Sequence, residues 1–235
     1  GGWSHDGERF AFASNRREES VFDLYVQDRN TVGDEAELVY EGDGWLSVAG
    51  WSPDDSQLLV HQAYSGYDGD LYVLDIETGE LDHLTPHDGT VRYNSPNWGP
   101  DGENLYLVTD RATDTLRLER LAVESGEFAV VETERRDHTG DEWNVGGLAV
   151  DEDSRRIVYG RNVEGYTEWT AGELVAPDRI DPFPDPNLPR GVSGGVSFGP
   201  DGDRFAVTVT GDTDNANVYV VEARSGDADR WTDAP

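Results

Sequence analysis

One serine lies in the pattern that α/β-hydrolases use for their nucleophile. Gly191-Val192-Ser193-Gly194-Gly195 matches G-x-S-x-G, in which the serine follows a strand, precedes a helix, and is followed later in the chain by an acid and then a histidine. The next residues, Gly199-Pro200-Asp201-Gly202, predict a reverse turn instead of a helix, and every histidine precedes Ser193. We interpret the match as a coincidence in a glycine-rich strand and expect no catalytic residues.

Histidines and carboxylates at short spacing can bind a metal ion, and three segments have such a spacing. His83 and His87 are four residues apart, as in a helical zinc pair, but Thr85 and Pro86 between them favour the end of a strand. The acidic loops 67–70 and 211–215 offer oxygen ligands to a hard cation, yet neither completes a calcium-loop pattern. We expect surface histidines, no metal site and no cofactor.

The elements around these residues repeat with a period of about 50 residues. Each repeat starts with an aromatic or apolar anchor and a turn rich in Ser, Pro, Asp and Gly, followed by short strands rich in Val, Tyr and Phe. The anchors are Trp3, Trp51, Trp98, Ala149 and Phe198. This pattern predicts an all-β fold, a β-propeller of four-stranded antiparallel blades.

We expect one propeller domain over residues 1–235 with five visible blades, at about 1–44, 45–90, 91–144, 145–192 and 193–235. The five blades either close a ring by themselves or form part of a seven- or eight-bladed ring. The strand before each anchor should line the central channel. The aromatic anchors Trp3, Trp51, Trp98 and Phe198 should pack between neighbouring blades as core residues.

A five-bladed glycosidase is one enzymatic alternative for such a fold. It needs two carboxylates that face the glycosidic bond from the channel mouth. The expected channel strands, at 48–50, 95–97, 145–147 and 194–196, contain no Asp or Glu. The sequence therefore favours recognition over catalysis.

The charge of the chain limits its partners. Against 49 Asp and Glu it has 18 basic residues, all of them arginine, and a formal net charge of -31. Such a surface repels nucleic-acid phosphates and anionic membranes. The acids are scattered among apolar runs, which indicates a folded protein, and we expect one from a high-salt cytoplasm, where charge repulsion is screened.

Two absences complete the composition. The chain has no cysteine and therefore no disulfide, and no apolar run approaches the roughly 20 residues of a membrane span. It also lacks methionine, even at its first residue. We expect a processed or excised piece that is not inserted in a membrane.

Blade two contains Trp51-Ser52-Pro53-Asp54, then Leu71-Tyr72-Val73-Leu74-Asp75, Thr78-Gly79-Glu80 and Leu84-Thr85, a series that resembles the repeats of TolB-like propellers. Three further segments are similar to the propeller of the prolyl-oligopeptidase family of serine peptidases, which includes dipeptidyl aminopeptidases and acylaminoacyl peptidases. They are Tyr93–Trp98 with Thr109-Asp110-Arg111, Asn162–Tyr166, and Leu188–Phe198. The resemblance covers essentially the whole chain.

In that family the propeller precedes an α/β-hydrolase domain and limits access to its active site to short or unfolded peptides. The resemblance therefore implies a gating propeller without catalytic residues, whose partners are a peptide substrate and a hydrolase domain. The alternative is a stand-alone TolB-like propeller that acts as a scaffold for protein partners. Both functions place the binding surface on loops at the rim of the channel.

We expect this rim to comprise the connections that enter the inner strands and those between second and third strands. Aromatic residues beside arginine in such loops are typical of interfaces. The binding candidates are Trp45, Arg92, Tyr93, Glu142, Trp143, Asn144, Arg111, Asn162 and Glu164, with Arg16, Arg17 and Asp141 nearby. The resemblance to some dipeptidases adds that Glu142 or Glu164 would hold the amino terminus of a substrate.

Overall fold

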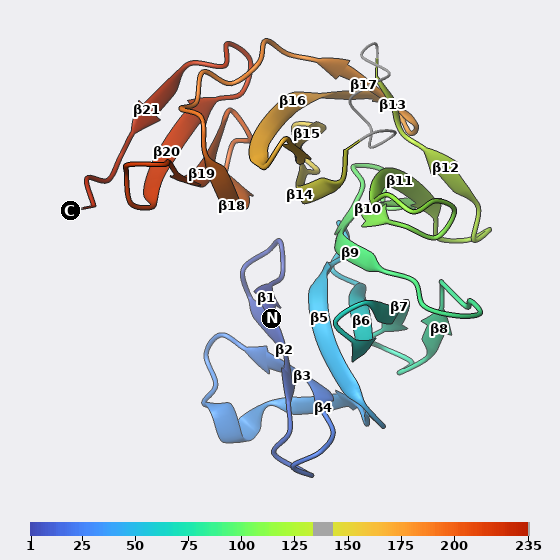
Figure 1. Cartoon of the computed structure of the whole chain (residues 1–235). Helices are drawn as coiled ribbons and strands as arrows, with labels where there is room; N and C mark the ends of the chain where they lie inside the picture. Colours follow the sequence, from blue (N-terminus) through green and yellow to red (C-terminus); the bar gives the residue numbers. More distant parts are fainter. Residues whose placement is uncertain (134–142, 235) are drawn as a thin grey trace.

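The computed structural model describes residues 1–133 and 143–234. In these residues the fold is all-β except for one 3-10 helix, η1 (Gly33–Glu35). Figure 1 shows five sheets in an arc around a common centre, with the first and the fifth on either side of its open part. None of the described elements is a helix that is long and apolar enough to span a membrane.

Each of the five sheets is built mainly from consecutive strands. Blade one comprises β1 (Gly2–Trp3), β2 (Arg9–Ser14), β3 (Asp23–Asp28) and β4 (Glu37–Tyr40), and blade two β5 (Trp45–Trp51), β6 (Gln57–Ser65), β7 (Asp68–Asp75) and β8 (Leu81–His83). Blade three comprises β9 (Tyr93–Trp98), β10 (Asn104–Thr109), β11 (Arg117–Ala122) and β12 (Phe128–Val130). Blade four comprises β14 (Val145–Asp151), β15 (Arg156–Val163), β16 (Tyr166–Ala176) and β17 (Arg179–Pro182), and blade five β18 (Val192–Phe198), β19 (Arg204–Thr210), β20 (Asn217–Glu222) and β21 (Ala228–Arg230).

The first strand of every blade lies nearest the centre, and each later strand of the blade lies farther out (Figure 1). Consecutive strands of a blade pair antiparallel. This radial order of four-stranded sheets defines a β-propeller. The predicted all-β fold with five four-stranded blades is confirmed.

Four of the inner strands carry a β-bulge near the middle. The pairing register shifts at Ala49 in β5, at Ser95 and Pro96 in β9, at Gly146 and Gly147 in β14, and at Gly195 in β18. Ser95 and Gly195 have φ angles of 47° and 65°, a conformation that glycine adopts at least cost. The small residues of the channel strands thus lie at the β-bulges, where the strand bends and an unusual backbone conformation is needed.

Blade four has a fifth strand that the repeat did not predict. β13 (Glu132–Thr133) pairs in parallel with β17, opposite Arg179 and Ile180. The segment that follows blade three therefore joins the outer edge of blade four. It satisfies hydrogen bonds that the edge strand would otherwise expose and ties the two blades together.

Two of the aromatic anchors pack between blades. Trp51 and Trp98 are 3% and 2% exposed. Trp51 contacts core residues of blades one and two, and its Nε1 donates to the carbonyl of Gly2 at 2.9 Å, while Trp98 packs among residues of blades two and three. Phe198 is half-buried against residues of blades four and five.

The expectation of a buried interblade anchor is wrong for Trp3, which is 58% exposed. Its ring meets only the edge of Phe10, at a centroid distance of 5.1 Å, among the aromatic contacts of the described residues. The other anchors pack against the preceding blade. Blade one borders the open part of the arc (Figure 1), so no described sheet covers that side of Trp3.

The turns that join the first and second strands of the blades lie together at one end of the propeller. We call them the turn ring: residues 4–8, 52–56, 99–103, 152–155 and 199–203. Neighbouring turns touch, since a side chain at Gly202 would collide with Ser154 and Asp151, and Arg156 pairs with Asp203 at 2.7 Å. The turn ring thus adds contacts between blades beyond their apolar core.

Candidate binding surface

The opposite end of the blades carries the loops that the sequence assigns to binding. Trp45, the first residue of β5, pairs with Ala63 near the end of β6, so the connection into an inner strand lies beside the hairpin between second and third strands. We call this end the rim: residues 15–22, 41–45, 64–67, 86–92, 110–116, 162–166, 183–191 and 211–216.

Three exposed aromatic residues gather on the rim of blade two. Trp45, Tyr64 and Tyr67 are 66%, 52% and 69% exposed. Trp45 packs on Phe22 with ring centroids 5.6 Å apart. Aromatic rings of this kind bring large contact area to an interface at a small loss of side-chain entropy.

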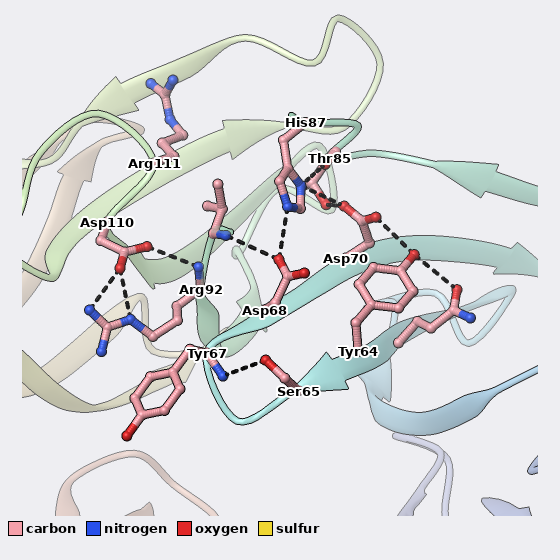
Figure 2. A network of polar contacts seen from close by, with 12 residues as sticks. Tyr64, Ser65, Tyr67, Asp68, Asp70, Thr85, His87, Arg92, Asp110 and Arg111 are labelled. Carbon is pink, nitrogen blue, oxygen red and sulfur yellow. Dashed lines mark hydrogen bonds and ion pairs between the residues drawn. The ribbon is translucent and has the colours of Figure 1, made fainter. Parts of the chain in front are cut away.

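Arg92 lies next to Tyr67 and is held in one orientation. Its backbone N and its Nε donate to the two carboxylate oxygens of Asp110 at 2.9 and 2.7 Å, and its guanidinium lies 5.8 Å from the ring centre of Tyr67. Figure 2 shows the pair between the hairpin of blade two and the loop of blade three. The arginine thus links two blades and leaves part of its fork exposed.

A buried carboxylate lies beneath the part of the rim that carries Trp45, Tyr64 and Tyr67, which we call the aromatic rim. Asp70, at the start of β7, is 5% exposed. One of its oxygens accepts from Thr85 Oγ1 at 2.9 Å and faces His87 Nδ1 at 3.1 Å, and the other accepts from the hydroxyl of Tyr64 at 3.0 Å (Figure 2). The exposed ring of Tyr64 is thereby anchored at its hydroxyl.

His87 lies between two carboxylates. Its Nε2 is 3.1 Å from Asp68 Oδ1, and its Nδ1 faces Asp70. Because carboxylates only accept, both contacts together require an imidazolium. Burial lowers the pKa of His87, but hydrogen bonds with the Thr85 carbonyl and the two aspartates outweigh it and raise that pKa above the ordinary value.

The same bonds recur in blade five, which shows that they also hold the blade together. Leu71 N donates to Thr85 Oγ1 at 2.8 Å, and Val218 N donates to Thr232 Oγ1 at 2.8 Å. Asn217 takes the place of Asp70 and accepts from Thr232 at 3.1 Å. In both blades the threonine ties the chain after the outer strand to the head of the third strand.

The expectation that His83 and His87 are separate surface residues is wrong for His87, whose side chain is 12% exposed. Both histidines reach Asp70, with His83 Nε2 3.1 Å from its second oxygen. The loop after β8 turns back onto β7, which sequence spacing alone does not reveal. Among the described residues no group of three or more His, Asp or Glu is arranged to hold a metal ion.

Two predicted binding residues are turned away from solvent or held by internal partners. Tyr93 is 3% exposed beneath His87 and Phe128, and burial raises its pKa to about 12. Its assignment as an exposed rim residue is therefore wrong, because β9 points it into the core. Arg111 donates to Glu119 at 2.7 Å and lies 4.0 Å from the ring centre of Phe128, beside a groove of about 880 Å³ between blades two and three.

The asparagines named as binding candidates hold loops in place. Asn144 Oδ1 accepts from Leu116 N at 2.8 Å, and Asn162 Oδ1 accepts from Gly165 N at 3.1 Å. Trp143 is half-buried. Glu142 and Asp141 lie outside the described residues.

The arginines Arg16 and Arg17 are likewise partnered within blade one. Arg17 grips the buried Asp23 with two nitrogens at 2.8 Å. Arg16 lies 4.5 Å from the ring centre of Tyr25. Neither guanidinium belongs to the aromatic rim of blade two.

Glu164 borders a cavity of about 420 Å³ on the rim of blade four. It lies at the tip of the β15–β16 hairpin with a φ angle of 50°. Arg190 covers the ring of Tyr166 at 3.7 Å, and the buried Arg161 pairs with Glu168 at 3.0 Å. The cavity thus presents charges of both signs beside aromatic carbon.

Ser193 lies on the channel strand β18, and its backbone N donates to Thr167 Oγ1 at 2.9 Å. After β18 the chain enters the turn at residues 199–203 instead of a helix. A hydrolase nucleophile is exposed by a tight turn between a strand and a helix. Ser193 instead lies within a strand, and no helix follows it in the described residues. No catalytic domain is evident in the described part of the chain.

The sequence placed Trp45 and Arg92 on the rim but did not single out Tyr64, Tyr67 or the network beneath them. One signal for that network is present in the repeats. A polar residue lies at or near the start of the third strand at Asp23, Asp70 and Asn217, and a threonine follows the outer strand at Thr85 and Thr232.

Comparisons with known proteins agree with this fold. The chain superposes on a prolyl endopeptidase, one of two analysed for the role of inter-domain dynamics in catalysis and specificity, with a TM-score of 0.75 and 15% identity over 97% of this chain and 34% of that one. It superposes on TolB from Acinetobacter baumannii with a TM-score of 0.66 and 16% identity, over 95% of this chain and 51% of that one. The structural neighbours are TolB and the propeller domains of prolyl oligopeptidases.

Sequence similarity to curated proteins is limited. The Tol-Pal system protein TolB of Francisella tularensis subsp. mediasiatica is 25% identical over 91 residues, which cover 39% of this chain and 20% of that protein. No family model matches the chain. The chain is thus a TolB-like β-propeller by fold, and it spans about a third of the prolyl endopeptidase and a fifth of the curated TolB.

Proposed function

We propose that this chain is a non-catalytic propeller that recognises and admits peptides for a prolyl-oligopeptidase-like serine peptidase, with catalysis on a hydrolase domain that this chain does not contain. The observation that carries the proposal is the presence of three exposed aromatic side chains on the rim of blade two, Trp45, Tyr64 and Tyr67, with Arg92 beside Tyr67. The superposition of 97% of the chain on a prolyl endopeptidase supports the family context.

The rim suits an extended peptide. Trp45, Tyr64 and Tyr67 offer ring faces to apolar side chains of such a peptide. The packing of Trp45 on Phe22 and the hydroxyl bond of Tyr64 reduce the entropy lost on binding. Arg92 keeps N–H groups for a peptide carbonyl because Asp110 occupies only one side of its fork.

The acidity of the chain sets the conditions for binding. A formal net charge of -31 attracts basic peptides at low ionic strength, and salt screens this attraction within a few Å. We propose that the protein works in a high-salt cytoplasm, where salt weakens long-range charge attraction but not the apolar contacts of aromatic rings. Peptide affinity should therefore depend more on the rings than on peptide charge.

A TolB-like scaffold for folded protein partners is the second candidate. The similarity of 91 residues to the Tol-Pal system protein TolB favours it. Such a scaffold would bind a folded partner over a large face of the propeller. It would not require an affinity for short, unfolded peptides.

One binding experiment separates these functions. Fluorescence anisotropy of a labelled proline-containing peptide measures affinity, and mass spectrometry of the same sample measures cleavage. We expect binding without cleavage, and affinity about tenfold lower in Trp45→Ala with Tyr67→Ala, since two such rings together contribute more than 1.4 kcal/mol. Trp231→Ala is the matched control, because Trp231 is 67% exposed but follows the outer strand of blade five.

The outcomes are distinct. Absence of peptide binding in the wild-type chain would favour the scaffold. Cleavage that Ser193→Ala abolishes would mean that the serine motif is catalytic and would refute the proposal. Equal affinity of the rim variant and the control would place the peptide elsewhere on the molecule.

A further inference from the structure

The turn ring contains a histidine that joins two blades which are not consecutive. His5, in the turn of blade one, has its Nδ1 2.8 Å from Asp55 Oδ1 in the turn of blade two. Its Nε2 lies 3.1 Å from Glu152 Oε2 in the turn of blade four. In Figure 1 the turn between β1 and β2 projects into the centre of the arc, so this contact crosses the end of the centre.

The turn of blade one is fixed to blade two independently of Glu152. The backbone N atoms of His5 and Asp6 donate to the carboxylate of Asp55 at 2.8 and 3.1 Å, and Arg9 donates to the Asp55 carbonyl at 2.7 Å. Loss of the contact with Glu152 would therefore leave this turn attached to blade two. It would release only the link between blade one and blade four.

Both ring contacts of His5 are favourable only when each nitrogen carries a proton: Nδ1 is hydrogen-bonded to Asp55, and Nε2 pairs with Glu152 by charge without a hydrogen bond. A carboxylate accepts hydrogen bonds, and a neutral imidazole donates from only one nitrogen. A neutral His5 can keep only one partner. We expect it to keep Asp55, because the shorter distance and the backbone bonds hold that carboxylate in place, and to release Glu152.

We propose that His5 and Glu152 form a proton-dependent latch that closes the turn-ring end of the propeller and opens as the pH rises. The latch joins the first blade of the arc to the fourth. When it is released, blade one gains freedom to move away from blade four, and the centre widens at this end. The proposal concerns the ring itself and does not depend on the peptidase function.

The charges around the latch shift the pKa values of both residues, and the shift of His5 agrees with this direction. Burial raises the pKa of Glu152 to about 7, with His5 opposing the shift and the neighbouring aspartates adding to it. Burial lowers the pKa of His5, but the hydrogen bond to Asp55 and the charge of Glu152 outweigh it, so the net shift is upward. The charged groups that face the pair are Asp6 and Arg9 of blade one, Asp55 of blade two, and Asp151 and Asp153 of blade four.

The sign follows from the shift of His5. This histidine binds its proton more tightly in the latched state than its ordinary pKa requires, so its protonation stabilises the latch. The contribution is fully present below the ordinary pKa of 6.5 and is lost as the pH rises through the raised pKa of His5. Glu152 does not add to it, because the contact with His5 lowers the pKa of Glu152 against the effect of burial.

A distance measurement tests the latch directly. The chain has no cysteine, so Glu8→Cys and Asp153→Cys can carry a pair of spin labels on the two turns. Pulsed electron paramagnetic resonance at constant high salt should give one short distance at about pH 5.5 and a longer, broader distribution at about pH 9. The ratio of closed to open molecules should fall by up to about tenfold per pH unit for each proton released.

Two variants distinguish the latch from a general effect of pH. His5→Ala keeps the backbone bonds to Asp55 and should give the open distribution at both pH values. Glu152→Gln should stay closed at both, because an amide can accept from or donate to the imidazole in either protonation state. His83→Gln, in β8 of blade two, should behave like the wild type. Distances that do not change with pH, or a His5→Ala distribution equal to that of the wild type, would overturn the proposal.

Discussion

His87 shows how single residues hold the binding rim. Its ring joins Asp68 at the hairpin of blade two to the buried Asp70, and Asp70 anchors the hydroxyl of Tyr64. A change at this histidine therefore reaches an exposed ring that it does not touch. The rim keeps its shape through buried hydrogen bonds, which contribute more when their donors and acceptors are charged.

The residue scale gives a prediction for His87 and pH. Its pKa is raised in the folded state, so its contribution to stability is present below about 6.5 and is lost as the pH rises through the folded value. The free energy of unfolding, measured by guanidinium denaturation, should decline less above about pH 6.5 in His87→Gln than in the wild type.

His61 provides the matched control for that measurement. Burial lowers its pKa, so its contribution has the opposite sign and disappears as the pH falls below about 6.5. In the wild type, protonation of His61 lowers the free energy of unfolding at low pH, and this loss should be absent in His61→Gln. The decline of the free energy of unfolding at high pH should be the same in both proteins. An unchanged alkaline slope in His87→Gln would contradict the bridged imidazolium.

Among the elements, the inner strands and their anchors decide how the blades are joined. Trp51 is buried between blades one and two and donates to the Gly2 carbonyl, whereas Trp3 occupies the equivalent position of blade one and is 58% exposed. Trp51 and Trp3 thus have different environments at the same position of the repeat. Blade one covers Trp51, whereas no described blade precedes blade one to cover Trp3.

This contrast predicts unequal costs of truncation. Trp51→Ala should lower the free energy of unfolding by about 3–5 kcal/mol, because it removes a large buried ring. Trp3→Ala should cost less than about 1 kcal/mol, as is usual for an exposed side chain. Denaturant titration of the two variants measures both values, and equal costs would contradict the observed packing.

Across the whole molecule, the two ends of the propeller differ in chemistry. The turn ring joins blades through short turns and ionised side chains such as His5 and Asp55. The rim carries longer loops, exposed aromatic rings and the fixed guanidinium of Arg92. One end thus joins the blades of the arc, and the other is the end at which we propose that a peptide binds.

The sequence predicted this architecture from its period because each blade is local in the chain. Every blade pairs strands that follow one another, so strand and turn signals suffice to find them. Trp45 and Arg92 could be assigned to loops for the same reason. β13 escaped prediction because it pairs with a strand of the next blade, about 50 residues away, and the repeat contains no equivalent of it.

The side-chain network could not be read from the sequence with the same ease. Asp70 and His87 meet only because the loop after β8 returns to the head of β7. Tyr93 was misplaced for a related reason: the first residue of a strand points to either face, and the register of β9 sends its ring into the core. The spacing of motifs along the sequence predicts the order of the strands. It does not predict to which face of the sheet the side chains at the strand ends point.

The central claim is that peptides bind at the aromatic rim of blades two and three and not elsewhere on the propeller. Hydrogen–deuterium exchange with and without a saturating proline-containing peptide tests it most directly, since exchange reports the protection of each backbone segment. The account predicts slower exchange in residues 41–46, 64–68 and 88–93 and no change in the turn ring. Protection confined to the turn ring or the outer strands would contradict it.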